Sequence, residues 1–231
     1  MISQIISLTA TGLMLFSTSS LPACAELNQP VKTSSGLLQG TPGKDPSVTA
    51  FRGVPYAAPP IGNLRWRGPQ AAASWTGVRH ADKFGNVCMQ NALKPGSFYQ
   101  VEFYESPEPM SEDCLYLNLW TAAKSAAEKR PVMLWIHGGG FVEGSGSLPS
   151  FHGESLAAKG VVLVTINYRL GVFGFLAHPE LANESPFHAS GNYGMLDQLQ
   201  ALKWVKANIQ NFGGDPDNVT IFDNPQAQAQ C

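Results

Sequence analysis

Short apolar runs separated by glycine and proline predict that strands and helices alternate along the chain. Residues 132–136 are apolar on both alternations, which is typical of a strand covered on both faces in a parallel sheet, and residues 161–168 are predicted to be a further strand. Residues 155–160 lie between them and predict a short helix that ends at Gly160. Because a strand, a helix and a strand in this order form a βαβ unit, we expect the two strands to pair in parallel.

Residues 193–212 carry the clearest helical pattern. Apolar side chains recur every three or four positions, so they share one face of a helix, and we expect that face to be buried. Asn192 is the expected N-cap, and Gly213 and Gly214 end the helix. The apolar positions of this face are Leu196, Leu199, Leu202, Val205, Ile209 and Phe212.

The remaining segments complete the predicted architecture. Residues 115–121 and 219–222 are expected to be strands, and residues 31–39 an N-terminal hairpin. Residues 51–69 alternate prolines with aromatic side chains, which predicts an ordered loop. Strands that alternate with helices predict an α/β fold with a mostly parallel central sheet and helices on both faces.

The composition narrows the possible functions. Charged residues make up 14% of the chain, the net charge is -2, and there is no basic block. Nothing therefore favours a nucleic-acid partner or an anionic membrane surface. The spacings of His80, His152, His178 and His188 match no zinc motif, so no metal is implied.

The first 25 residues have the pattern of an export signal. Residues 5–16 are mostly apolar but too few to span a bilayer, and Ala23-Cys24-Ala25 is a signal-peptidase pattern with the cut after Ala25. The chain is therefore predicted to be secreted or periplasmic. An alternative is a lipoprotein anchored at Cys24, because residues 21–24 resemble a bacterial lipobox.

Two internal cysteines, Cys88 and Cys114, belong to the part of the chain predicted to be exported. That context favours a disulfide between them, and two free buried thiols are the alternative. Closing this loop would stabilise the fold by roughly 3–4 kcal/mol in the chain-entropy description.

Three glycines follow the predicted strand at 132–136 directly. Without a Cβ, Gly138, Gly139 and Gly140 allow backbone N–H groups to approach a ligand atom closely. Such groups can stabilise the oxyanion that forms when an acyl group is attacked, and His-Gly-Gly-Gly is an oxyanion-loop pattern of lipases and esterases. The alternative is a glycine-rich turn without chemistry.

Several longer segments resemble one family, the type-B carboxylesterases. They are residues 112–120, 167–171, 191–198, 212–216 and 218–222, together with Cys88-Met89-Gln90. The resemblance implies an α/β-hydrolase fold over residues 31–222 and ester hydrolysis by a serine, histidine and acid triad without a cofactor. It also implies that Gly139 and Gly140 donate to the oxyanion, that His137 orients the loop rather than acting as a base, and that Cys88 pairs with Cys114.

The resemblance stops after Phe222. The family continues with Gly-Glu-Ser-Ala-Gly, whereas residues 223–227 read Asp-Asn-Pro-Gln-Ala, so Pro225 occupies the position of the nucleophile. The acid and the histidine follow the serine in this fold, so they too are absent. Ser145 and Ser147 lack the elbow pattern and are expected to be solvated loop residues.

These observations predict three parts: a signal peptide at 1–25, the N-terminal part of a carboxylesterase domain at 26–222, and a divergent tail at 223–231. We expect this chain to be inactive alone, as an N-terminal fragment in which a truncation or a frameshift ends the family pattern after Phe222; a true short product is the other possibility. The alternative is a non-catalytic binding or adhesion module of the same fold. The strand at 219–222 should become an open sheet edge prone to aggregation. The substrate, a small-molecule ester, and the oligomeric state are not specified further.

Overall fold

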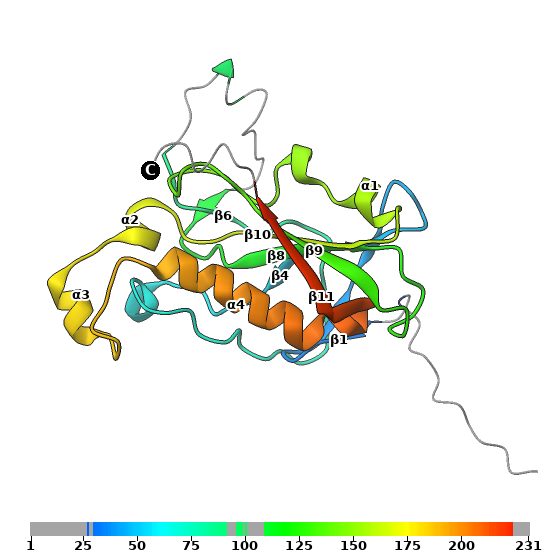
Figure 1. Ribbon diagram of the computed structural model, residues 1–231, viewed down its shortest axis with the longest axis horizontal. Coiled ribbons are helices and arrows are strands. Elements are labelled where there is room, and N and C mark those ends of the chain that lie inside the picture. The colour runs from blue at the N-terminus through cyan, green and yellow to red at the C-terminus, as the bar shows by residue number, and fades with distance from the viewer. Residues whose placement is uncertain (1–26, 28–29, 92–95, 99, 101–108, 224–231) are drawn as a thin grey trace, which may run out of the picture.

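A six-stranded sheet forms the centre of the molecule in the computed structural model, which describes residues 27, 30–91, 96–98, 100 and 109–223 (Figure 1). The predicted signal peptide and most of the divergent tail lie outside these residues. The strand order is β11-β9-β10-β8-β4-β3. Their bounds are β3 Thr41–Pro42, β4 Thr49–Pro55, β8 Tyr116–Thr121, β9 Arg130–Ile136, β10 Val162–Ile166 and β11 Gly214–Asp223.

The described sheet is mixed, not mostly parallel. β9 pairs in parallel with β10 and with β11, which confirms the predicted βαβ unit, whereas β10–β8, β8–β4 and β4–β3 are antiparallel. A parallel connection needs a crossover of about a dozen residues or more. The link from β8 to β9, residues 122–129, is shorter than that, so the chain reverses direction there.

The prediction of a loop over residues 51–69 is wrong at its start, because Thr49–Pro55 is strand β4. Phe51 and Val54 are buried in it. Pro55 stands at the last position, where a missing N–H is tolerated. Gly53 has a φ of +67° at a register shift, and a Cβ there would lie 2.4 Å from the carbonyl oxygen of Lys83. A proline at the end and a glycine at a bulge therefore fit a strand.

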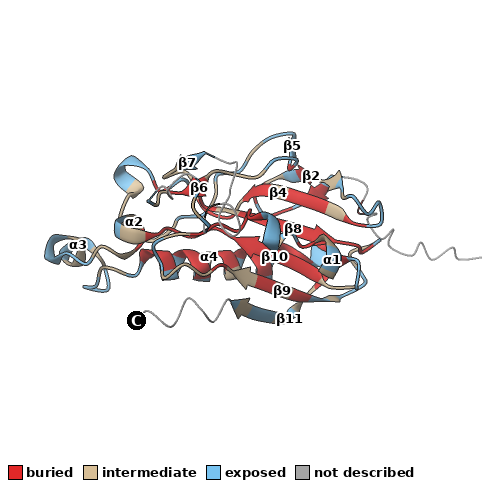
Figure 2. Ribbon diagram, turned by 90° about the horizontal axis from the view of Figure 1, so that it is seen from above, coloured by how far each residue is buried: buried red, intermediate tan, exposed pale blue. Residues whose placement is uncertain are grey.

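Helices cover both faces of the sheet (Figure 2). α4 (Tyr193–Asn208) continues into η4 (Ile209–Phe212) and packs on the larger core with Val132 and Leu134 of β9. α1 (Glu154–Ala157) packs on the opposite face, beside Trp120. The shorter helices are η1 Gly62–Leu64, η3 Pro149–Phe151, α2 Gly171–Phe175 and α3 Pro179–Glu184. None of the helices in the described residues is long and apolar enough to cross a bilayer.

The extent of the predicted helix at 193–212 agrees with α4 and η4, but its buried face differs. Val205, Ile209 and Phe212 are buried as expected, whereas Leu196 and Leu199 are 39% and 48% exposed. The helix is rotated because its buried side includes Asp197, which binds Arg169. Part of the apolar stripe therefore faces away from the sheet.

Two small sheets flank the central one. β1 (Val31–Lys32) and β2 (Leu37–Gln39) form the predicted hairpin, and β5 (Val78–His80) pairs in parallel with β2. β6 (Val87–Cys88) pairs with β7 (Met110–Ser111).

Candidate active site

The glycine loop, residues 137–144, begins where β9 ends and lies at the carboxyl edge of the parallel strands. Gly139 and Gly140 have φ angles of +114° and +58°, in the region that favours glycine. A Cβ on Gly139 would lie 2.1 Å from the carbonyl oxygen of Glu143. The path of the backbone therefore favours glycine at positions 139 and 140, which distinguishes this loop from an ordinary flexible turn.

Carbonyl groups of the loop are held by donors that surround it. The oxygen of His137 accepts a hydrogen bond from the Tyr168 hydroxyl at 2.9 Å. The oxygen of Gly139 accepts from the N–H groups of Val142 and Glu143 at 3.1 and 3.3 Å. The oxygen of Phe141 accepts from the N–H of Gly171 at 2.7 Å, which helps to hold Phe141 at a φ of +64°.

The N–H groups of Gly139 and Gly140 remain available. No acceptor among the described residues bonds either of them. Both residues are half-buried, so the two donors sit at a partly shielded position next to each other in the chain. Fixed carbonyls and unpaired neighbouring N–H groups are the arrangement that an oxyanion hole requires.

His137 helps to aim these donors. Its ring is buried, stacks on Tyr168 with ring centres 4.5 Å apart, and places Nδ1 2.9 Å from the oxygen of Gly138. Nδ1 therefore carries the hydrogen and donates it. Because the peptide is planar and trans, holding the Gly138 carbonyl toward His137 turns the N–H of Gly139 to the opposite side.

Burial lowers the pKa of His137 to about 4. Protonation would place a charged N–H at Nε2, which is buried and has no partner in the described part of the chain. The imidazole is therefore neutral near pH 7, and a group with this pKa is a weak base. These properties fit the predicted orienting role.

Gln90 holds the far end of the glycine loop, a contact that the sequence analysis did not anticipate. Its Oε1 accepts from the N–H of Gly144 at 2.9 Å, and its Nε2 donates to the oxygen of Gly144 at 3.0 Å. A disulfide joins Cys88 to Cys114, as expected, and thereby anchors the segment that carries Gln90. The only sequence signal was that Gln90 belongs to the Cys88-Met89-Gln90 motif.

Ser145 and Ser147 are not solvated, which corrects the expectation for them. Both are buried, and their hydroxyl oxygens lie 2.7 Å apart. The Ser145 hydroxyl also donates to Oδ1 of Asn167 at 3.3 Å, and the N–H of Gly146 donates to the same oxygen at 2.7 Å. These hydroxyls anchor the chain after the glycine loop.

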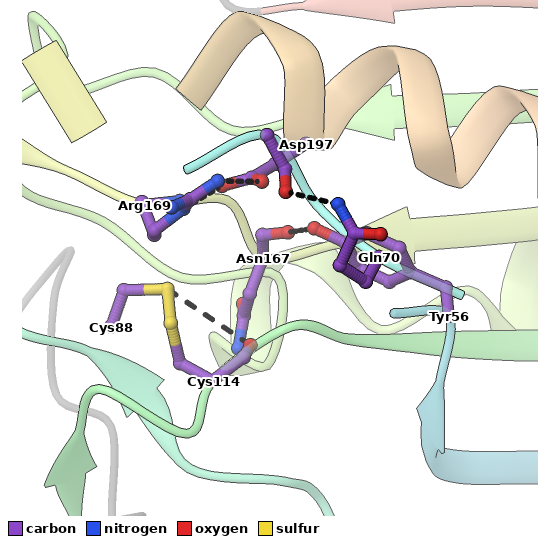
Figure 3. A network of polar contacts seen from close by, with 8 residues as sticks. Tyr56, Gln70, Cys88, Cys114, Asn167, Arg169 and Asp197 are labelled. Atoms are coloured by element: carbon purple, nitrogen blue, oxygen red, sulfur yellow. Dashed lines mark hydrogen bonds and ion pairs between the residues drawn. A yellow bond between two sulfur atoms is a disulfide. The ribbon is translucent and has the colours of Figure 1, made fainter. Parts of the chain in front are cut away.

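A buried ion pair joins Arg169 to Asp197 of α4 (Figure 3). Nε and Nη2 of Arg169 donate to the two carboxylate oxygens of Asp197 at 2.8 and 2.7 Å, and the N–H of Arg169 adds a third bond at 3.0 Å. Close by, the Tyr56 hydroxyl donates to the backbone oxygen of Asn167 at 2.6 Å. These contacts join the end of β10 to α4 and β4, so they fix the backbone beside the glycine loop.

The histidines other than His137, and Trp66, are not part of the glycine loop. His80, His152, His178 and His188 are exposed, and the described residues contain no group of three or more potential metal ligands. Trp66 lines a cavity of about 470 Å³ between the 66–70 segment and residues 181–196. No residue of the glycine loop lines this cavity. The nucleophile position, Pro225, falls among the residues that the structure does not describe.

Comparison with known proteins identifies the family. The model of the carboxylesterase family matches residues 28–225, which is most of the chain.

The chain belongs to the carboxylesterase family.

Individual carboxylesterases agree with this assignment. The chain is 47% identical over 206 residues to the fumonisin B1 esterase of Sphingopyxis macrogoltabida, covering 87% of this chain and 36% of that protein. It is 45% identical to the para-nitrobenzyl esterase of Bacillus subtilis, covering 84% of this chain and 38% of that protein.

A solved structure gives the same result. The carboxylesterase EST55 of Geobacillus stearothermophilus superimposes with a TM-score of 0.74 at 45% identity, covering 86% of this chain and 38% of that chain. The fold is therefore that of the α/β hydrolases. The chain spans little more than a third of the length of these relatives.

Proposed function

We propose that this carboxylesterase chain supplies the sheet scaffold and two oxyanion donors, the N–H groups of Gly139 and Gly140, to a carboxylic ester hydrolase. The observation that carries the proposal is the glycine loop, in which the carbonyls of His137 and Gly138 are held while the two N–H groups stay free. The similarity to the fumonisin B1 esterase and the para-nitrobenzyl esterase supports ester hydrolysis as the reaction.

In the proposed reaction, a serine hydroxyl attacks the carbonyl carbon of a small-molecule ester. A histidine takes the hydroxyl proton and returns it to the leaving alcohol, and water then releases the acyl group. Negative charge forms on the former carbonyl oxygen, which the two glycine N–H groups stabilise. Removing one such donor typically raises the barrier by about 3–4 kcal/mol.

Residues 1–231 lack the serine elbow, so we propose that they do not hydrolyse esters alone. We also propose export, on the basis of the apolar stretch at 5–16 and the cleavage pattern that ends at Ala25. A binding or adhesion module of the same fold would have no use for two preorganised oxyanion donors.

The function can be tested in a chimera. Residues 30–222 would replace the matching part of the Bacillus subtilis para-nitrobenzyl esterase, and hydrolysis of p-nitrophenyl acetate would be measured. We expect the chimera to turn over the ester and the 231-residue chain to show no saturable turnover. A folded but inactive chimera, or turnover by the chain alone that is lost on Gly139→Ala, would contradict the proposal.

The oxyanion role has a matched control. Gly139→Ala in the chimera should lower kcat by about 10²–10³-fold, because the loop must move and misplace its donors. Gly160→Ala also introduces a Cβ at a positive φ, +97°, but into open space. It should leave kcat within about twofold of the parent chimera, since it removes no oxyanion donor. Equal losses in the two variants would count against an oxyanion role for Gly139.

A further inference from the structure

A cavity beside α3, which we call the α3 cavity, has the size of a small-molecule site. Its volume of about 470 Å³ lies within the range of about 300–1,000 Å³ that is typical of ligand pockets. One wall is the segment after η1, at residues 66–70, and the other runs from α3 to the start of α4, at residues 181–196. Figure 1 shows α3 at one end of the fold. The glycine loop contributes no residue to the lining, so the α3 cavity is separate from the candidate active site.

Trp66 is held in the wall of the α3 cavity. Its backbone has a φ of +56°, a conformation that a bulky residue keeps only where its surroundings hold it. Its Nε1 donates to the backbone oxygen of Val172 at 2.9 Å, and the Arg65 guanidinium lies 5.7 Å from its ring centre. Arg65 is itself held by Glu112 through hydrogen bonds of 2.5 and 2.6 Å. The aromatic surface of Trp66 is therefore in place before a ligand binds, which lowers the entropic cost of binding.

Tyr193 brings an unpaired hydroxyl to the α3 cavity. The residue is only 6% exposed, yet no described residue hydrogen-bonds its hydroxyl, although a buried tyrosine usually has a partner. Burial raises the pKa of Tyr193 above its ordinary value, so the hydroxyl stays protonated at pH 7 and can donate. Asn192 lines the same cavity, and its side chain makes no cap bond to α4. The cavity therefore offers one phenol hydroxyl and one carboxamide to a ligand.

The uncharged polar side chains elsewhere in the lining already have partners. The Ser185 hydroxyl oxygen accepts from the N–H of Phe187 at 3.3 Å, and the Ser190 hydroxyl donates to the backbone oxygen of His178 at 3.1 Å. Nε2 of Gln70 donates to the backbone oxygen two positions earlier at 3.0 Å. A carbohydrate carries many hydroxyl groups, and most of them would lose water here without gaining a partner. A ligand with only one or two polar groups fits the lining better.

The α3 cavity has no net charge. Arg67 and Glu184 are the charged residues of its lining, and Nη2 of Arg67 lies 2.8 Å from Oε2 of Glu184. Because the two charges neutralise each other, the lining favours neither an anion nor a cation. Its apolar and aromatic side chains are Trp66, Leu181, Pro186, Phe187, Tyr193 and Leu196. Aromatic side chains pair well with another planar ring, in stacked or edge-to-face geometry.

We propose that the α3 cavity binds a neutral, planar aromatic molecule that carries one or two hydrogen-bonding substituents, as a phenol or an aromatic amide does. The ring packs against the aromatic side chains of the lining, and its polar substituent pairs with the Tyr193 hydroxyl or the Asn192 carboxamide. This is an accessory site outside the glycine loop. The inference does not depend on the part that the chain plays in ester hydrolysis.

The test is a ligand-observed NMR titration of the full 231-residue chain with 2-naphthol, a neutral phenol with two fused rings. We expect saturable binding with a dissociation constant of about 1 mM or tighter, which is reasonable for a ligand of about eleven non-hydrogen atoms. Two further probes test the assigned chemistry. 2-Naphthoate has the same rings but a negative charge, and methyl glucoside is neutral but not aromatic. Both should bind at least about tenfold more weakly, because the charge or the extra hydroxyls would be buried without partners.

Substitutions locate the binding site. Ala189→Trp places a large side chain in the lining and should weaken 2-naphthol binding at least about tenfold. Ala73→Trp is the matched control, because Ala73 is also an exposed loop alanine but does not line the cavity. It should leave the dissociation constant within about twofold of the parent value, since it lies outside the contact. Tyr193→Phe removes only the hydroxyl and should weaken binding by about two- to tenfold, the effect of one hydrogen bond. Circular dichroism melting would verify that each variant is folded.

Several results would overturn the proposal. One is the absence of saturable 2-naphthol binding. Another is an equal loss in Ala189→Trp and Ala73→Trp, which would indicate unspecific adhesion to exposed apolar side chains. Unchanged affinity in Tyr193→Phe would contradict the role of its hydroxyl, and tighter binding of 2-naphthoate or methyl glucoside would contradict the ligand class. Because none of these measurements involves ester hydrolysis, their failure would leave the proposed function intact.

Discussion

At the residue scale, the glycine loop depends on a histidine that stays neutral. His137 holds the Gly138 carbonyl through Nδ1. A second proton on the ring would be unfavourable, because Nε2 is buried without a partner among the described residues. The same titratable side chain is therefore both buried in the fold and bonded to the glycine loop. Its charge state affects both the stability of the fold and the aim of the donors.

The pKa of His137 makes a pH-dependent stability prediction. Its folded pKa is about 4, below the ordinary value of 6.5, so the unfolded chain binds more protons between these values. The contribution of His137 is complete above pH 6.5 and is lost as the pH falls toward 4, up to about 3 kcal/mol. Denaturant titrations at pH 7 and pH 4.5 would measure the loss.

The control for this prediction is His137→Gln, which cannot titrate. Its unfolding free energy should change less between the two pH values than that of the parent chain, whereas the exposed His80→Gln should match the parent. An imidazole resonance of His137 that titrates near 6.5 in NMR spectra would show the prediction to be wrong.

At the element scale, the Arg169–Asp197 pair connects the end of β10 to α4. Both side chains are almost fully buried, and their three hydrogen bonds position the helix against the sheet. This pair also explains the rotation of α4, since Asp197 occupies a buried position that an apolar helix face would otherwise fill. The exposed leucines of α4 follow from that rotation.

Removing one partner of the pair should be costly. Asp197→Ala leaves the Arg169 guanidinium buried and unpaired, so we expect the unfolding free energy to fall by about 3–5 kcal/mol. The double variant Arg169→Met with Asp197→Leu removes both charges and should be clearly more stable than Asp197→Ala. Urea unfolding of the three proteins would measure this difference, and a double variant less stable than the single one would refute the explanation.

At the scale of the whole molecule, the sheet has an open edge and the helix beside it an uncovered apolar face. Without a partner, such surfaces favour association between copies of the chain. The ion pair between Lys206 and Asp217 is exposed and lies near the start of β11. It therefore does not cover the apolar side chains near the other end of the strand.

We predict that the 231-residue chain alone self-associates into oligomers of mixed size. Ile221→Lys should reduce this association because it places a charge on the free edge of β11. Ile61→Lys is the control and should not reduce it, because Ile61 is equally exposed, at 51%, but lies in the segment before η1. Light scattering over a range of protein concentrations would measure the effect. A monodisperse monomer of the unmodified chain that melts cooperatively would contradict the prediction.

Local sequence patterns predicted the elements in which apolar residues repeat regularly from one end to the other. The strands at 132–136 and 161–168 and the helix at 193–212 were found because apolar residues follow the period of each structure. β4 was missed because Pro55 and Gly53 are usual loop residues, and only the pairing with β8 shows that they occupy an end and a bulge. The burial of the Ser145 and Ser147 hydroxyls was missed because Ser145 is held by Asn167, 22 positions further along the chain, and no local pattern reveals that contact.

The sequence by itself determined the family, the order of the main elements and the place of the glycine triplet, because these depend on residues close together in the chain. The tertiary structure decided which groups of the triplet are free to act. The donors that hold its carbonyls include Tyr168 and Gly171, and Gln90 holds its far end. The tertiary structure also decided which side of α4 is uncovered, because a buried ion pair and not the apolar period sets the rotation of that helix.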